Sequence, residues 1–133
     1  MSDTQGFGFD SAMRVVVIDD VQSARRIVRR LLEKMGFTNI VEVEDSTKAL
    51  AKIKEAPTGL VISDWNMPGI PGIDLVKNLR NDAELSSVPF IMITSSSDKE
   101  AVVEAFEAGA SDYVLKPFGF DTLVEKVKGA LKL

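Results

Sequence analysis

The chain has 133 residues, 45% of them hydrophobic and 27% charged, which is typical of one globular domain that buries a core without disulfides or a structural metal. Sixteen lysines and arginines against twenty aspartates and glutamates give a net charge of −4, which argues against nonspecific nucleic-acid binding. The sequence contains no cysteine and no histidine, so disulfides, zinc fingers, thiol nucleophiles and histidine-based catalytic triads are excluded.

The N-terminal segment 1–12 is polar and contains glycine, and it has neither the basic n-region nor the apolar h-region of a signal peptide. We expect it to be a flexible tail in front of a domain that spans residues 13–133. No apolar run in the sequence approaches the roughly eighteen residues that a membrane span needs. These features predict a cytoplasmic protein that binds neither a membrane nor nucleic acid.

After the tail, short apolar runs rich in β-branched residues alternate with longer segments of helical periodicity. In chain order, the predicted elements are a strand at 14–18, a helix at 24–35, a strand at 40–43, a helix at 46–55, a strand at 60–62, a helix at 72–81, a strand at 90–93, a helix at 98–108, a strand at 113–115 and a helix from residue 120 or 121 to the C-terminus. Strict alternation predicts an open, doubly wound α/β domain, in which helices cover both faces of a parallel sheet. No residues remain for a second domain.

The periodicity also predicts which side chains face the core. In the first helix, Ile27 is expected on the inner face and Arg25 on the solvent face. In the fourth helix, Phe106 is expected to face inward. Asp98 and Asp121 are expected to cap the N-termini of the last two helices.

Polar side chains follow several predicted strands at the point where each strand ends. Asp19 and Asp20 follow the first strand, Asp64 the third, Thr94 the fourth and Lys116 the fifth. In open α/β sheets, ligands bind outside these carboxyl ends of the strands. Carboxylates that converge without histidine or cysteine select a hard cation, and Mg²⁺ suits a site with few carboxylates. Mg²⁺ beside a lysine and a hydroxyl suits phosphoryl transfer, with one carboxylate attacking in line.

Four motifs in this order resemble the signature of response-regulator receiver domains. The motifs are Val17-Ile18-Asp19-Asp20, Asp64-x-x-Met67-Pro68-x-x-x-Gly72, Thr94-Ser95, and Gly109-Ala110-x-x-Tyr113-x-x-Lys116-Pro117. The resemblance covers residues 13–133. Within this family, the sequence is most similar to the CheY-like stand-alone chemotaxis regulators. It implies the flavodoxin-like receiver fold, a five-stranded parallel sheet in the order 2-1-3-4-5.

The resemblance also implies a role for each residue of the predicted site. Asp64 is the implied phosphoacceptor. The implied Mg²⁺ ligands are Asp64 itself, Asp20 directly, Asp19 through water or as a second acidic ligand, and Asn66 through its backbone carbonyl. Lys116, beside a cis peptide bond to the following proline, is implied to pair with the phosphoryl group.

Two residues are implied to transmit the phosphorylation as a conformational switch. Thr94 would hydrogen-bond the phosphoryl group, and Tyr113 would change rotamer in response. Three positions depart from the family pattern. Pro71 stands where an acidic or polar residue is usual, which is expected to stiffen the loop after Asp64. Ser96 stands where CheY-like proteins commonly carry glutamate, which affects the expected phosphate lifetime and partner recognition. Ser46 stands where glycine is frequent, and the sequence gives it no function.

The predicted function is that of a single-domain response regulator in a two-component system. A sensor histidine kinase would donate a phosphoryl group from phosphohistidine to Asp64. The phosphorylated protein, a monomer, would signal through contacts with a downstream protein, and the favoured pathway is chemotaxis control of the flagellar motor switch. A phosphatase is a further expected partner. The protein would not be an enzyme beyond catalysing its own phosphorylation and dephosphorylation.

Three alternative functions remain at this point. A phosphorelay shuttle would pass the phosphoryl group on to a second histidine. A Mg²⁺-dependent phosphohydrolase with an aspartyl-phosphate intermediate would want a second acid two positions after the nucleophile, where this chain has Asn66. A flavin-binding flavodoxin-like module is disfavoured because the strand ends are acidic and poor in glycine.

Overall fold

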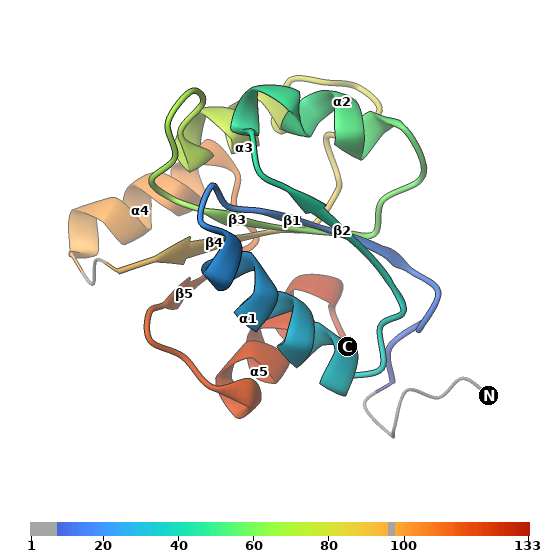
Figure 1. Cartoon of the computed structure of the whole chain (residues 1–133). Helices are drawn as coiled ribbons and strands as arrows, with labels where there is room; N and C mark the ends of the chain where they lie inside the picture. Colours follow the sequence, from blue (N-terminus) through green and yellow to red (C-terminus); the bar gives the residue numbers. More distant parts are fainter. Residues whose placement is uncertain (1–7, 96–97) are drawn as a thin grey trace.

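The computed structural model describes residues 8–95 and 98–133 of the chain (Figure 1). Its elements in chain order are β1 (Arg14–Ile18), α1 (Gln22–Lys34), β2 (Asn39–Val43), a 3₁₀ turn η1 (Ser46–Lys48), α2 (Ala49–Lys54), β3 (Leu60–Asp64), α3 (Gly72–Arg80), β4 (Phe90–Thr94), α4 (Lys99–Ala108), β5 (Asp112–Leu115) and α5 (Phe120–Leu131). The strands form one parallel sheet in the order β2-β1-β3-β4-β5. The predicted fold class and strand order are therefore confirmed.

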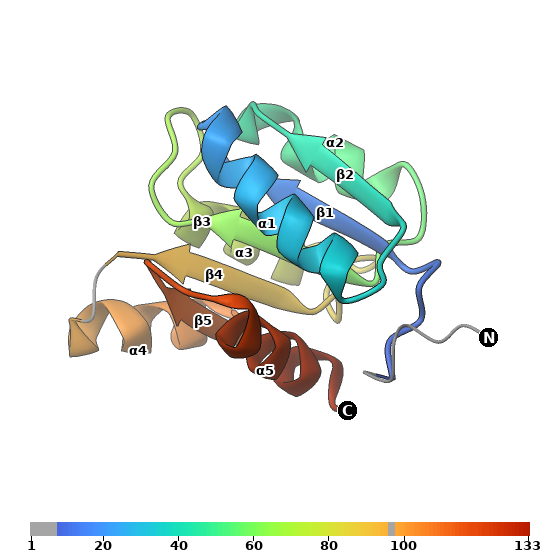
Figure 2. The same ribbon diagram turned by 60° about the horizontal axis from the view of Figure 1, so that its bottom comes forward.

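The helices cover both faces of the sheet, α1 and α5 on one face and α2, α3 and α4 on the other (Figures 1 and 2). Each central strand is buried along its whole length because successive side chains point to opposite faces and both faces are covered. In β1, for example, Val15 and Val17 pack under α1 and α5, whereas Val16 and Ile18 pack under α2, α3 and α4. The sheet therefore lies between two apolar cores, one under α1 and α5 and one under α2, α3 and α4.

The predicted inner face of α1 is wrong at two positions. Arg25, expected in solvent, is buried, and Ile27, expected inside, is 55% exposed. The helix turns Val28 and Leu32 toward the core, and Arg25 lies on their side of the helix. Its guanidinium is tolerated there because it is hydrogen-bonded to Glu42 and to a backbone carbonyl.

The predicted inner face of α4 is also wrong at Phe106, which is 45% exposed. Ala105, which the same periodicity also places inward, is buried, and so is Ala108. The predicted cap Asp98 is confirmed, since its side chain accepts a hydrogen bond from the Glu100 amide at 3.2 Å. Asp121 is not a cap, because α5 begins one residue earlier.

The predicted tail of residues 1–12 differs from the structure at its C-terminal end. Residues 1–7 lie outside the described residues. The following segment packs on the domain: the Phe9 ring is buried and stacks on Phe37 at 5.0 Å between centroids. The Ser11 carbonyl accepts hydrogen bonds from the backbone amide and the hydroxyl of Thr38, at 3.0 and 2.9 Å. Within the described residues, no helix has both the length and the apolar character needed to span a bilayer.

Candidate functional site

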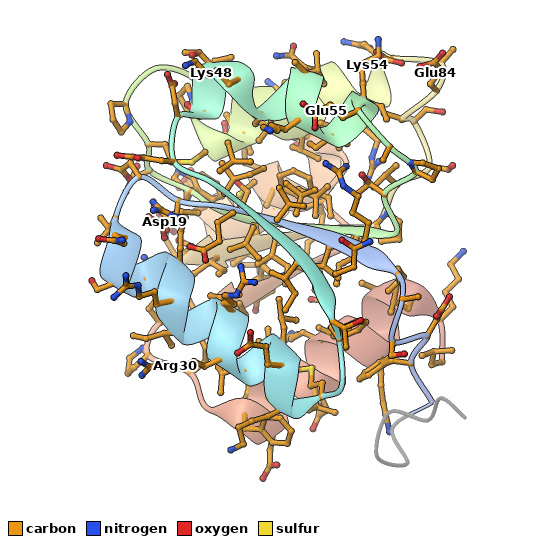
Figure 3. The ribbon with its side chains drawn as sticks, turned by 45° about the vertical axis from the view of Figure 1, so that its right-hand side comes forward. Asp19, Arg30, Lys48, Lys54, Glu55 and Glu84 are labelled. Atoms are coloured by element: carbon orange, nitrogen blue, oxygen red, sulfur yellow. The ribbon has the colours of Figure 1, made fainter. Side chains whose placement is uncertain are left out.

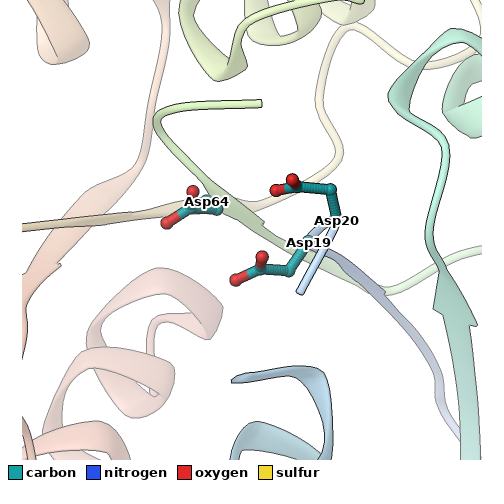
Figure 4. A group of neighbouring side chains, drawn as sticks. All are labelled: Asp19, Asp20 and Asp64. Atoms are coloured by element: carbon teal, nitrogen blue, oxygen red, sulfur yellow. The ribbon is translucent and has the colours of Figure 1, made fainter. Parts of the chain in front are cut away.

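Three carboxylates meet where β1 and β3 end side by side. Asp19 and Asp20 directly follow β1, and Asp64 is the last residue of β3. The register pairs Ile18 with Ser63, so Asp19 and Asp64 follow a matched pair on adjacent strands. Each of the three side chains offers a carboxylate oxygen within 4.8 Å of the others (Figure 4). The strand order reverses between β1 and β3, which is where ligands bind in doubly wound sheets.

The burial of this acidic cluster is uneven. Asp19 is 4% and Asp64 7% exposed, whereas Asp20 is open to solvent. Among the described residues, the ion pair that reaches the cluster joins Lys116 Nζ to Asp64 Oδ1 at 2.8 Å. Three carboxylates against one ammonium leave excess negative charge in a place where water screens it poorly.

The pKa of the Asp19 carboxyl is raised above its ordinary value, chiefly because burial disfavours the charged form. The Val21 amide, which donates to Asp19 Oδ1 at 2.9 Å, acts against this rise. The charges of Asp64 and Asp20 add to it, and Lys116 opposes it. Ionised Asp19 is therefore held at some cost, which a cation among the three carboxylates would relieve.

β4 and β5, which lie two and three strands from β1 in the sheet, contribute the neutral and the cationic residue of the site. Thr94 ends β4 and is buried, and its carbonyl accepts a hydrogen bond from the Lys116 amide at 2.8 Å. The Lys116–Pro117 peptide bond is cis. The structure thus brings Asp19, Asp20, Asp64 and Lys116 into one cluster and sets Thr94 on the adjoining strand end.

Tyr113 lies farther from the strand ends than the other site residues. Its position on β5 pairs with Met92 on β4, two residues before the pair of Thr94 with Leu115. The half-buried ring meets the edge of the Phe106 ring at 5.8 Å between centroids, with an interplanar angle of 86°. Lys126 Nζ lies 4.8 Å from the ring centroid, in cation–π geometry. Phe106 and Lys126 therefore hold the ring between α4 and α5.

The loop after Asp64 folds back onto the strand end and depends on Gly72. The Gly72 amide donates to the Trp65 carbonyl at 3.0 Å. A Cβ at this glycine would lie 2.5 Å from the Asp64 carbonyl oxygen and 2.8 Å from Met92 Sδ, so no other residue fits without displacing the backbone. Asn66, whose carbonyl is an expected metal ligand, lies in this loop.

An apolar groove of about 260 Å³ adjoins the site. It is lined by Asp19, Ala24, Ile27, Val28, Ile93, Lys116, Pro117 and Phe118. The exposed Ile27 of α1 is one wall, and the residues after β5 are the other. The groove thus offers apolar contact directly beside the Asp64–Lys116 pair.

The sequence did not identify two residues that support the site. Arg25 Nη1 donates to the Asp19 carbonyl at 2.7 Å, and its Nε donates to Glu42 Oε1 at 3.1 Å. A signal was present, because Arg25 precedes the buried Val28 and Leu32 by three and seven residues, which is the spacing of one helix face. Ser46 contacts the loop after Asp64. Ser96 lies outside the described residues.

Comparison of the chain with known proteins agrees with this geometry. The family model of the response regulator receiver domain matches residues 15–128. Chemotaxis protein CheY-3 of Vibrio cholerae is 44% identical over 115 residues, which cover 86% of this chain and 88% of that protein. Chemotaxis protein CheY of Pseudomonas aeruginosa is 39% identical over 116 residues, covering 87% of this chain and 94% of that protein.

Solved structures give the same result. The structure of the chemotaxis response regulator CheY4 of Vibrio cholerae matches with a TM-score of 0.83 at 31% identity, covering 90% of this chain and 99% of that chain. The signal receiver domain of a histidine kinase from Syntrophus aciditrophicus matches with a TM-score of 0.81 at 28% identity, covering 91% of each chain. The chain therefore belongs to the family of response regulator receiver domains.

Proposed function

We propose that this protein is a chemotaxis response regulator that accepts a phosphoryl group on Asp64 from the phosphohistidine of a sensor kinase. The observation that carries the proposal is the Asp64 carboxylate, buried between an ammonium at 2.8 Å and two further carboxylates at the ligand-binding edge of the sheet. The protein is a signalling protein of the CheY-like type and not an enzyme with a separate substrate. We place it in the cytoplasm as a monomer.

The residues of the acidic cluster fit a bound Mg²⁺ ion. Their donors are oxygens only, and two of the three carboxylates are buried. Burial and, to a smaller extent, the neighbouring carboxylates raise the pKa of Asp19, and a cation would offset both effects. Asp19, Asp20, Asp64 and the backbone carbonyl of Asn66 would hold the ion. When bound, Mg²⁺ would neutralise charge on the oxygens of the transferred phosphoryl group.

The chemistry of the proposed transfer falls to Asp64 and Lys116. A carboxylate oxygen of Asp64 attacks the phosphorus of the phosphohistidine, a P–O bond forms in line as the P–N bond breaks, and the imidazole leaves with the electron pair. The Lys116 ammonium lies within ion-pair distance of the attacking group, where it can pair with a phosphoryl oxygen. A carboxylate nucleophile has no proton to lose when it attacks, so this step needs no general base.

The apolar groove beside the cluster supports a protein as phosphodonor. Its walls on α1 and after β5 carry exposed or half-buried apolar side chains, among them Ile27 and Phe118. An apolar helix face of the kinase would pack there while its phosphohistidine reaches Asp64. We propose the flagellar motor switch as the downstream target, since the named relatives are chemotaxis proteins, and a phosphatase as the partner that ends the signal.

The proposed signal runs from Asp64 through Thr94 to Tyr113. A phosphoryl group adds charge and acceptor oxygens to the strand ends, and the buried Thr94 hydroxyl is the neutral donor on the adjoining strand. Its movement toward the phosphoryl group would free space on the side of β4 that faces α4. Tyr113 on β5 would turn into this space and leave its contacts with Phe106 and Lys126.

The test uses beryllofluoride, a mimic of the phosphoryl group, together with Mg²⁺. Trp65 is the only tryptophan and adjoins Asp64, so its fluorescence should report binding in the wild type but not in Asp64→Asn. Amide chemical shifts should change at Tyr113 and along α4 as well as in the loop after Asp64, and Thr94→Ala should lose the distant changes. Changes confined to that loop, or a full distant response in Thr94→Ala, would contradict the proposed coupling.

A further inference from the structure

We infer that Ser46 is a positioning residue of the metal site, because its hydroxyl holds the loop that carries Asn66 in place through hydrogen bonds. The inference rests on the proposed function. Ser46 is the first residue of η1, in the connection that follows the edge strand β2, and it is not one of the three carboxylates of the acidic cluster. Its effect would be exerted through the backbone that it holds.

The Ser46 hydroxyl is buried and uses both of its hydrogen-bonding functions on one loop. The residue is 1% exposed. Its Oγ donates to the Pro68 carbonyl at 2.9 Å and accepts from the Ile70 amide at 2.8 Å. The hydroxyl therefore acts as a donor to one loop residue and as an acceptor from another, which restrains the positions of both partners.

The loop between Asp64 and α3 is held at its two ends by backbone hydrogen bonds. The Trp65 amide donates to the Ile93 carbonyl at 2.8 Å, and the Gly72 amide donates to the Trp65 carbonyl at 3.0 Å. Between these anchors, Gly69 has a φ of +88°, which permits the sharp turn there. In the middle of the loop, Ser46 bonds to Pro68 and Ile70, and the Ser63 hydroxyl donates to Met67 Sδ at 3.9 Å. The Ser46 bonds are the ones that link the loop to the segment after β2.

The connection after β2 also packs against this turn. A Cβ at Gly69 would lie 2.9 Å from Thr47 Cγ2 and 3.2 Å from Ser46 Oγ. The two segments are therefore in direct contact, and Ser46 is the polar link between them. Asn66 precedes Pro68 by two residues, so the Ser46 bonds limit how far its carbonyl can move relative to the three carboxylates.

A small displacement of that carbonyl matters because of the geometry that Mg²⁺ demands. The ion takes near-ideal octahedral coordination at about 2.0–2.1 Å from its oxygens. Residues that orient ligands without binding the ion typically change metal affinity by about 10- to 100-fold when they are removed. Loss of the Ser46 hydroxyl should therefore weaken Mg²⁺ binding while the fold is retained.

The experiment compares Ser46→Ala with a control that deletes another partly buried hydroxyl. The Thr58 hydroxyl accepts from Arg14 at 2.8 Å and donates to the Ile53 carbonyl at 3.0 Å. Thr58 precedes β3, whereas Asp64 ends it, so the control lies at the opposite edge of the sheet. Figure 3 shows this separation: Asp19 lies at the left of the view, and Lys54, the last residue of α2, lies at the upper right.

Mg²⁺ titrations followed by Trp65 fluorescence should give a dissociation constant about tenfold higher for Ser46→Ala than for the wild type. Thr58→Val should lower the melting temperature at least as much and leave the dissociation constant within about twofold. Hydrogen exchange at the Ile70 amide should be faster in Ser46→Ala without Mg²⁺.

A second variant, Ser46→Gly, also removes the hydroxyl and adds no atom to the packed turn, so it should weaken Mg²⁺ binding as well. If both variants bind Mg²⁺ within twofold of the wild type, Ser46 is not a positioning residue although the proposed function stands. If Thr58→Val weakens binding as much as Ser46→Ala, the effect is general destabilisation and the inference fails. If the wild type binds no Mg²⁺, the proposed function itself fails.

Discussion

Two adjacent arginines on α1 give a direct test of the packing around the site. Arg25 is buried and donates two charged hydrogen bonds, to Glu42 Oε1 at 3.1 Å and to the Asp19 carbonyl at 2.7 Å. Arg26 is exposed. Charged hydrogen bonds contribute about 1.5–3 kcal/mol each. Glu42 retains its ion pair with Arg29 at 3.1 Å, so loss of the Arg25–Glu42 hydrogen bond should cost an amount at the low end of this range. We expect Arg25→Ala to lower the free energy of unfolding by about 3 kcal/mol.

The measurement is urea unfolding at neutral pH without Mg²⁺, with Arg26→Ala as the matched control. The control should lie within about 0.5 kcal/mol of the wild type, because an exposed side chain away from such networks contributes little. For a domain of this size, about 3 kcal/mol corresponds to a fall of roughly 10 °C in the melting temperature. Equal effects of the two substitutions would show that Arg25 does not anchor the turn that carries Asp19 and Asp20.

Three further predictions concern the acidic cluster and its surroundings. Because the folded state raises the pKa of Asp19 above its ordinary value of 3.8, the folded state binds more protons there, and the metal-free protein loses stability from this group as the pH rises through the raised pKa. Asp19→Asn should remove that slope in urea unfolding at several pH values and stabilise the metal-free protein at neutral pH, while abolishing its stabilisation by Mg²⁺. Gly72→Ala should lower the free energy of unfolding by about 2 kcal/mol, since the added Cβ would lie 2.5 Å from the Asp64 carbonyl, and it should also weaken Mg²⁺ binding. Lys116→Met removes the ammonium 2.8 Å from Asp64, so Mg²⁺ should bind at least as tightly in a fluorescence titration, whereas beryllofluoride should no longer produce the shifts at Tyr113.

Much of the fold and site could be predicted from two kinds of rule. The periodicity that identifies helices and strands is local, and the position of the strand ends depends only on strand direction. Alternating strands and helices imply a parallel sheet, and parallel strands end at one edge. Asp19, Asp64, Thr94 and Lys116 could therefore be grouped without knowing any distance. The order of the strands came from the resemblance to receiver domains and not from the spacing.

The errors occurred where tertiary contacts override residue type. Arg25 was assigned to solvent because it is charged, although the helical period places it with Val28 and Leu32. Phe106 was assigned to the core because it is apolar, but the buried residues of α4 are Ala105 and Ala108, and Phe106 packs on Tyr113 near the surface. Ser46 could not be assigned because its partners lie more than twenty residues away in another loop.

The central claim is that Asp64 accepts a phosphoryl group, and covalent labelling tests it most directly. The protein is incubated with Mg²⁺ and a small phosphodonor such as acetyl phosphate, and the labelled peptide is identified by mass spectrometry. We predict one acid-stable, base-labile acyl phosphate on Asp64 and no labelling of Asp64→Asn, which keeps the shape of the side chain but lacks the nucleophilic carboxylate. A phosphoryl group on another residue, or labelling of Asp64→Asn at the wild-type level, would contradict the account.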